Sequence, residues 1–130
     1  MLSLVPSLVV SNSKVKSLAD TFVDVIVPLN DPRTTVYMAN NVDPYIGGPY
    51  GDNNSYNTYT HIGDLFHTEN LEGLYLSYSE TEFLLAEAVE RGLISGDAEM
   101  HYNNAVTASI EYWGGSQADA DTYLAQSSVA

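Results

Sequence analysis

Apolar residues recur with helical spacing in two stretches of the second half of the chain, residues 79–92 and 97–113. In the first stretch, apolar side chains cover most of the helix circumference, which is typical of a helix packed between neighbours. In the second stretch they form one broad stripe. The opposite face of that stretch carries Asn103, Asn104, Thr107 and Glu111. The pattern therefore predicts two packed helices joined by a short turn.

Local signals mark where the two helices begin and end. Ser79 and Glu82 have the spacing of a capping box, in which the two side chains satisfy free N–H groups of the first turn. Asp97 is a suitable N-cap for the second helix. Gly92 ends the first stretch and Gly114 follows the second, and glycine commonly terminates helices.

Small residues on the two predicted helices follow the register of a tetratricopeptide-type hairpin. Ala86 on the first helix is followed on the second by Ala98, Tyr102 and Ala105, at offsets typical of a repeat of about 34 residues. A single repeat cannot bury both of its faces, and arrays usually need about three or more units. We therefore expect the isolated chain to self-associate, or to pair with the remainder of a longer protein.

The remaining segments have weaker signals. Residues 14–29 show helical spacing, although a β-branched run weakens it, and residues 118–125 indicate a third helix. We predict a mainly α-helical fold, in a single fragment that comprises residues 1–130. The fragment divides into an irregular, loop-rich segment (14–73), a tetratricopeptide-like helical hairpin (74–114), and a partial third helix and tail (115–130).

A long segment over residues 40–72 is rich in Asn, Gly, Asp, Pro and Tyr. Gly47, Gly48 and Gly51 permit positive φ there. Loops of this length in a compact domain are usually functional or disordered. The tyrosines argue against disorder, because disordered linkers are poor in aromatic residues.

Tyrosine dominates the aromatic residues, with 10 Tyr against 3 Phe and 1 Trp. A tyrosine ring combines a flat apolar face with a hydroxyl. A sugar ring combines a C–H face with a hydroxyl edge, so the two are suited to stacking. The candidate ligand-binding residues are the four tyrosines of the loop: Tyr45, Tyr50, Tyr56 and Tyr59. The alternative is that these rings anchor the loop by packing against the rest of the fold.

The chain is strongly acidic, with 4 basic against 17 acidic residues and a net charge of −13. This charge argues against a nucleic-acid partner, whose phosphates would repel the chain, and against electrostatic docking on anionic lipid. The absence of cysteine excludes disulfides and zinc–thiolate sites. No apolar run approaches the ~20 residues that a membrane-spanning helix needs.

The sequence contains no motif for catalysis or for binding a metal or cofactor. His61, His67 and His101 lack metal-ligand spacing, so we expect structural or surface positions for them. Residues 52–54 lack the regular acid ladder of a calcium loop. With 17 carboxylates, chance Asp/Glu pairs are unavoidable, so no glycosidase pair is assigned. We predict no catalytic residue, no metal site and no cofactor.

Several short sequence motifs of the chain occur in a characteristic order. They are DPR (31–33), a Y-x-G-x-x-x-G stretch (45–51), LLAEA (84–88), RGLISGDAE (91–99), YNNAVTAS (102–109) and YWG (112–114). Together they resemble the SusD/RagB family, outer-membrane nutrient-binding lipoproteins of Bacteroidetes. The resemblance spans about residues 30–125 and is densest over residues 74–114. One departure is Leu93, where the family usually has an aromatic residue.

The resemblance implies an α/α SusD-like fold, of which this chain would be a fragment from the C-terminal half. It implies non-catalytic capture of oligosaccharides, or sometimes peptides, by a surface-exposed lipoprotein of the outer membrane. It also implies a partner, a SusC-like TonB-dependent transporter. The apolar start of the chain lacks the features of a signal peptide, and no lipobox cysteine follows. We therefore expect the export signal and the anchor to lie outside this chain.

Two rival functions stay open at this point. A tetratricopeptide-like adaptor would grip a partner peptide in a concave groove and would show further repeats in the same register, which are not found upstream of Tyr78. A small carbohydrate-active enzyme would need a cleft with a perturbed carboxylate pair.

Overall fold

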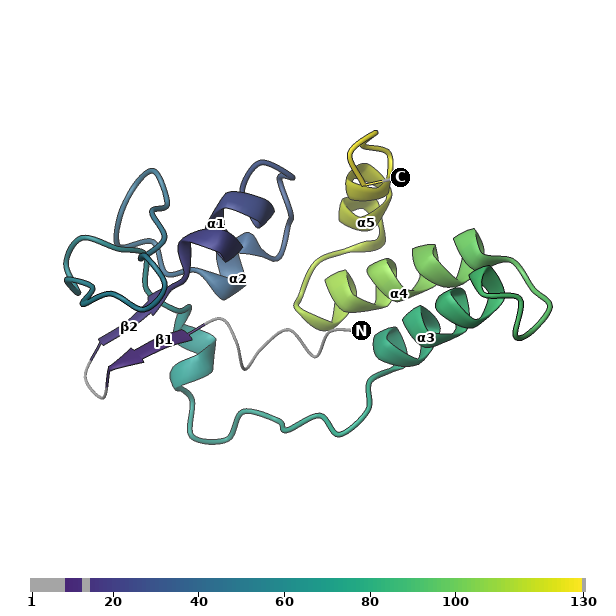
Figure 1. Cartoon of the computed structure of the whole chain (residues 1–130), viewed down its shortest axis with the longest axis horizontal. Helices are drawn as coiled ribbons and strands as arrows, with labels where there is room; N and C mark the ends of the chain where they lie inside the picture. Colours follow the sequence, from purple (N-terminus) through teal and green to yellow (C-terminus); the bar gives the residue numbers. More distant parts are fainter. Residues whose placement is uncertain (1–8, 13–14, 130) are drawn as a thin grey trace. The chain divides into compact units, whose positions relative to one another are not determined.

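The computed structural model describes residues 9–12 and 15–129 (Figure 1). The apolar start of the chain, residues 1–8, lies outside the described residues. The described chain divides between Glu72 and Gly73 into two compact units, here named the N-terminal unit and the C-terminal unit.

The N-terminal unit combines a two-stranded sheet with short helices. Its elements are β1 (Val9–Asn12), β2 (Val15–Leu18), α1 (Asp20–Ile26), α2 (Thr34–Tyr37) and the 3₁₀ helix η1 (Asp64–His67). The two strands are antiparallel, with Val9 opposite Leu18. The core of the unit consists of Leu18, Val23, Ile26 and Met38, with Phe22, Val27, Tyr37 and Tyr45 packed against it.

The helical spacing over residues 14–29 predicts the wrong element for the first part of that segment. Residues 15–18 form β2, and only residues 20–26 are helical. The strand is stabilised by distant partners. The Leu18 N–H donates to Thr60 O at 2.9 Å, and Leu18 O accepts from the Gly48 N–H at 2.7 Å. Periodicity within one segment contains no information about such partners.

The C-terminal unit contains only helices and their connections in its described part. The helices are α3 (Tyr78–Glu90), α4 (Ala98–Tyr112) and α5 (Gln117–Leu124). Helices α3 and α4 pack against each other as the predicted hairpin (Figure 1), and α5 packs on α4. The apolar side chains buried in this unit include Ala86, Ala105, Val106 and Ile110. The prediction of a mainly α-helical fold is confirmed.

The helix ends agree with the sequence signals except at the start of α3. Asp97 caps α4 by accepting from the Met100 N–H at 3.1 Å. The predicted capping box of Ser79 and Glu82 is wrong, because α3 begins at Tyr78 and its N-cap is Ser77, which accepts from the Glu80 N–H at 3.0 Å.

The side chain of Ser79 instead joins the two helices of the hairpin. Its hydroxyl donates to Ala105 O at 2.8 Å. Such a hydrogen bond requires the two backbones to approach closely, which the small side chain of Ala105 permits. At the C-terminal ends of the two helices, Gly92 and Gly114 adopt φ values of 67° and 89° and terminate α3 and α4 as predicted.

Large apolar side chains remain exposed on the hairpin. They include Leu84, Leu93, Ile94 and Met100. Exposed apolar surface of this kind favours association with another chain or chain segment. Self-association therefore stays a prediction.

Candidate functional site

The loop that is predicted to carry function is fixed at its base. The buried Thr60 joins both sides of the loop, because its N–H donates to Ile46 O and its hydroxyl accepts from the Ile46 N–H, each at 2.7 Å. The side chain of Asn41 accepts from the His61 N–H at 2.9 Å and donates to Tyr59 O at 3.0 Å. These bonds tie residues 41 and 46 to residues 59–61, so the base of the loop has a defined conformation.

Glycine allows this loop to lie close to the rest of the N-terminal unit. A Cβ at Gly47 would overlap the backbone of Asp20, and a Cβ at Gly63 would overlap the carbonyl oxygen of Val36. Gly51, in contrast, adopts the positive φ that the sequence permits, at 81°. Two different physical requirements therefore select glycine in one loop.

The four candidate tyrosines differ in exposure. Tyr50 is 79% exposed and Tyr56 is 48% exposed, whereas Tyr45 and Tyr59 are half-buried. The Tyr56 ring stacks on the His61 imidazole, with ring centroids 3.7 Å apart and planes inclined by 18°. The His61 Nε2 lies 2.5 Å from Tyr56 O. The rings that a ligand can reach most freely are therefore those of Tyr50 and Tyr56.

Tyr45 lies at a different place from the two exposed rings. It packs against the core of the N-terminal unit and also borders a hollow of about 520 Å³. The hollow is lined by Thr35, Val36, Met38, Ala39, Asn40, Tyr45, Asp64 and Leu65. Tyr45 can therefore anchor the fold and still present part of its ring to the hollow.

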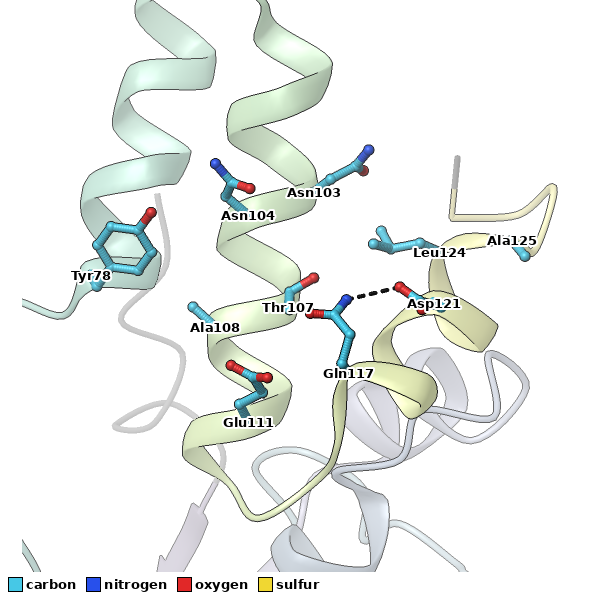
Figure 2. Close-up of a pocket in the computed structure, with 10 residues that line it drawn as sticks. All are labelled: Tyr78, Asn103, Asn104, Thr107, Ala108, Glu111, Gln117, Asp121, Leu124 and Ala125. Atoms are coloured by element: carbon cyan, nitrogen blue, oxygen red, sulfur yellow. Dashed lines mark hydrogen bonds between the residues drawn. The ribbon is translucent and has the colours of Figure 1, made fainter.

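The C-terminal unit has a hollow of its own, of about 570 Å³, between the start of α3, the polar face of α4 and α5 (Figure 2). We call it the helical groove. Its lining consists of Tyr78, Asn103, Asn104, Thr107, Ala108, Glu111, Gln117, Asp121, Leu124 and Ala125. The α4 residues belong to the polar face that the sequence pattern predicts. The pattern does not show that α3 and α5 enclose this face, so the groove is not found from the sequence.

A polar network connects the hairpin to the helical groove. The buried carboxylate of Glu82 lies 2.7 Å from His101 Nδ1. The hydrogen bond with His101 is the main cause that lowers the pKa of Glu82, with burial opposing it and bonds with Tyr78 and Asn104 adding to it. The bond with Glu82 raises the pKa of the Tyr78 hydroxyl. Glu82 therefore joins α3 to α4, and His101 has the structural position expected for it.

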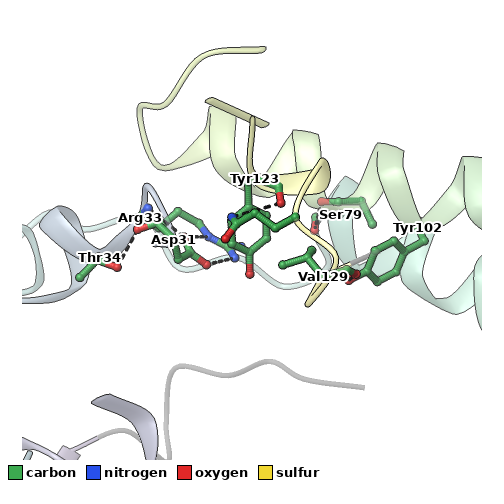
Figure 3. Close-up of polar contacts among 9 residues, drawn as sticks. Asp31, Arg33, Thr34, Ser79, Tyr102, Tyr123 and Val129 are labelled. Atoms are coloured by element: carbon green, nitrogen blue, oxygen red, sulfur yellow. Dashed lines mark hydrogen bonds and ion pairs between the residues drawn. The ribbon is translucent and has the colours of Figure 1, made fainter. Parts of the chain in front are cut away.

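The Asp-Pro-Arg motif forms a local set of hydrogen bonds in the N-terminal unit (Figure 3). The Arg33 Nε donates to Asp31 Oδ1 at 2.8 Å, and the Arg33 Nη2 donates to the other carboxylate oxygen. The Thr34 hydroxyl donates to Asp31 O at 2.6 Å, at the start of α2. Asp31 is buried, and a charge removed from water needs such a partner. The Asp-Pro-Arg motif therefore has a structural role in this chain.

Comparison with known proteins assigns the chain to a family. The family model of SusD-like proteins, described as starch-binding and associating with the outer membrane, matches residues 6–130. The chain belongs to this family. A solved structure of a chitin-binding protein is similar to this SusD-like chain, with a TM-score of 0.69 and 28% identity. The similarity covers 84% of this chain and 29% of that protein. No curated protein sequence matches the chain significantly.

The family resemblance that the sequence motifs indicate is therefore confirmed. The chain is a member of a carbohydrate-binding family that associates with the outer membrane. Among the helices that the structure describes, none is both long and apolar enough to cross a membrane. Within the same described ranges, no group of three or more His, Cys, Asp or Glu side chains is placed to hold a metal ion.

Proposed function

We propose that this SusD-like chain binds oligosaccharides without chemical turnover, and that Tyr50 and Tyr56 supply the stacking surfaces. The observation that carries this assignment is the exposure of both rings on a loop whose base is fixed by the buried Thr60. A ring held on a rigid support loses little conformational freedom when a ligand binds, so more of the contact energy appears as affinity.

The stacking geometry follows from the neighbours of each ring. His61 covers one face of the Tyr56 ring, so a sugar would stack on the opposite face. Tyr50 is open to solvent over most of its surface. Asn53 lies between the two tyrosines in sequence and is exposed, and its amide can both donate to and accept from sugar hydroxyls. Tyr45 and Tyr59 would act mainly as anchors that hold the loop in place.

Isothermal titration calorimetry of the chain against a panel of neutral oligosaccharides, including α-glucan and chitin oligomers, tests the assignment. Tyr50→Ala and Tyr56→Ala should each weaken binding by about tenfold to a hundredfold, by analogy with the ~1–3 kcal/mol that stacking on an aromatic side chain provides. Tyr75→Ala is the matched control, because Tyr75 is fully exposed and lies outside both hollows. Equal affinities in all variants would place saccharide binding elsewhere.

Incubation of the chain with the same oligosaccharides separates binding from catalysis. Oligosaccharides recovered after long incubation with the chain should have their original length, because binding by stacking makes and breaks no covalent bond. Shortened products would favour the carbohydrate-active enzyme instead.

We place this binding in a nutrient-uptake complex at the cell surface. The chain would be part of a surface lipoprotein that captures oligosaccharides and passes them to a SusC-like TonB-dependent transporter. The family's association with the outer membrane supports this placement. Because the chain spans 29% of the similar chitin-binding protein, the transporter contact is best tested with the longest natural chain that contains residues 1–130. Co-purification with such a transporter is the expected result, and purification of the lipoprotein alone from cells that also produce the transporter would contradict it.

A further inference from the structure

The helical groove has a size and a lining that suit a sugar. Its volume of about 570 Å³ falls within the range of about 300–1,000 Å³ that small-molecule sites occupy. Tyr78, which is 62% exposed, contributes an aromatic ring at one side. Leu124 contributes an apolar side chain from α5 (Figure 2). The groove thus offers apolar surface for a C–H face.

The polar groups of the groove match sugar hydroxyls. The side-chain amides of Asn103, Asn104 and Gln117 each donate and accept, as a sugar hydroxyl does. The Thr107 hydroxyl does the same. In Figure 2 these side chains project from α4 and α5 toward the space between the helices. A ligand with many hydroxyls can therefore pair with several of them at once.

The charge of the groove restricts what it can bind. Glu111 and Asp121 are among the lining residues, and no lysine or arginine is among them. Carboxylates accept hydrogen bonds from hydroxyls and attract a protonated amine, but repel an acidic sugar. The preferred ligand is therefore a sugar without an acid group, and a basic amino sugar gains an additional attraction.

Internal hydrogen bonds hold the groove in shape before any ligand binds. The Gln117 Nε2 donates to Asp121 Oδ1 at 2.8 Å (Figure 2). Helix α5 is fixed at its start by a capping box of Ser116 and Asp119. On the other side, the contact between Glu82 and His101 Nδ1, at 2.7 Å, joins α3 to α4. Side chains held in this way lose less freedom when a ligand binds.

We propose that the helical groove is a second saccharide subsite, which prefers amine-bearing sugars to their N-acetylated forms and rejects uronic acids. It lies in the C-terminal unit and uses none of the loop tyrosines. It extends the saccharide binding proposed above, and it can be tested separately because its residues are different.

The test is an NMR titration of the chain with three oligomers of equal length, built from glucosamine, N-acetylglucosamine and galacturonic acid. Side-chain amide signals of Asn103, Asn104 and Gln117 should shift with the first two oligomers and stay in place with the third. Asn103→Ala should weaken both interactions by about threefold to tenfold, as expected for one lost hydrogen bond. Shifts with the galacturonic acid oligomer of equal affinity, or no shift with any oligomer, would overturn the assignment.

The charge preference has its own control, because a chain of net charge −13 attracts any cation. Glu111→Gln should lower the preference for the glucosamine oligomer by about 1.4-fold to fivefold, the range of an exposed ion pair. Glu90→Gln removes the same charge from the exposed end of α3, outside the groove, and should leave the preference unchanged. Equal effects of the two variants would show a nonspecific attraction and would overturn the proposed selectivity.

The Tyr50→Ala variant separates this subsite from the loop. The amide shifts in the groove should persist in that variant at unchanged affinity. If the groove signals respond to Tyr50→Ala as strongly as to Asn103→Ala, the two sites are not separate and the second subsite is refuted. If the loop variants have no effect but the groove shifts remain, the loop assignment fails alone.

Discussion

Replacing Gly63 by alanine tests how tightly the tyrosine loop lies against the N-terminal unit. Gly63 has φ −60° and ψ 152°, which any residue can adopt, so the backbone conformation itself adds no cost. The cost comes from the added Cβ, which would overlap the carbonyl oxygen of Val36 and lie 2.9 Å from its carbonyl carbon. Neither atom is at the end of a flexible side chain, so the backbone has to move.

The magnitude follows from the contacts that this movement would break. Overpacking a closely packed site typically costs about 1–3 kcal/mol. The Gly63 N–H donates to Tyr37 O at 2.9 Å, and a shift of Gly63 weakens that hydrogen bond, whose net contribution is about 0.5–1.5 kcal/mol. We therefore expect Gly63→Ala to lower the free energy of unfolding of the N-terminal unit by about 2–4 kcal/mol.

Native-state hydrogen exchange measures this change within the unit concerned. The amides of Leu18 and Ala39 donate to Thr60 O and His61 O, so their protection reports whether the loop stays in place. A loss of about 2–4 kcal/mol corresponds to exchange that is faster by about 30-fold to 900-fold.

Gly73→Ala is the control for this experiment. A Cβ at Gly73 would meet nothing within 4 Å, and a Gly→Ala change at an unstrained site usually stabilises a chain by about 0.4–1 kcal/mol. The Leu18 and Ala39 amides should be less protected in the Gly63→Ala variant than in the Gly73→Ala variant. Equal protection in the two variants would refute the close approach of the loop.

The remaining predictions concern the C-terminal unit. Ser77→Ala should destabilise α3 by about 0.5–2 kcal/mol in urea unfolding, because it removes the N-cap; unchanged stability would contradict the cap. The hydrogen bond with His101 lowers the pKa of Glu82 in the folded chain, so its ionised form stabilises the fold above the unfolded pKa of about 4.3, and this stabilisation is lost as the pH falls through the folded pKa. Below about pH 4.3, the stability of the Glu82→Gln variant should therefore decrease less with falling pH than that of the unmodified chain. The Glu90→Gln variant should lose stability as the unmodified chain does. The same dependence of stability on pH in both variants would refute the pairing of Glu82 with His101. Sedimentation velocity should show association through the apolar side chains exposed on the hairpin, and a monomer without dye-binding apolar surface would contradict this.

The hairpin could be predicted because its signals are local. Periodic apolar residues and a cap such as Asp97 act within one or two helical turns, and the structure places α4 within one residue of its predicted limits. The predicted cap of α3 is wrong because Ser77 and Ser79 each precede a glutamate by three residues, so the local sequence does not distinguish them. The choice depends on Ala105, which binds the Ser79 hydroxyl, and on His101, which binds Glu82. Both partners lie on the other helix.

The sites depend still more on distant contacts. The sequence does not distinguish the four loop tyrosines, whereas the structure leaves Tyr50 and Tyr56 exposed and Tyr45 and Tyr59 half-buried. The strand at residues 15–18 depends on loop backbone more than 25 residues away. The helical groove requires α3, α4 and α5 to be placed in space before its lining can be identified. Local patterns contain none of this information.

The most direct measurement of the central claim is an NMR titration of the chain, with its tyrosine rings isotope-labelled, against a neutral oligosaccharide. The account predicts that the ring signals of Tyr50 and Tyr56 shift together and saturably, while those of the half-buried Tyr59 change little. Ring signals of Tyr50 and Tyr56 that stay in place at saturating oligosaccharide would contradict it.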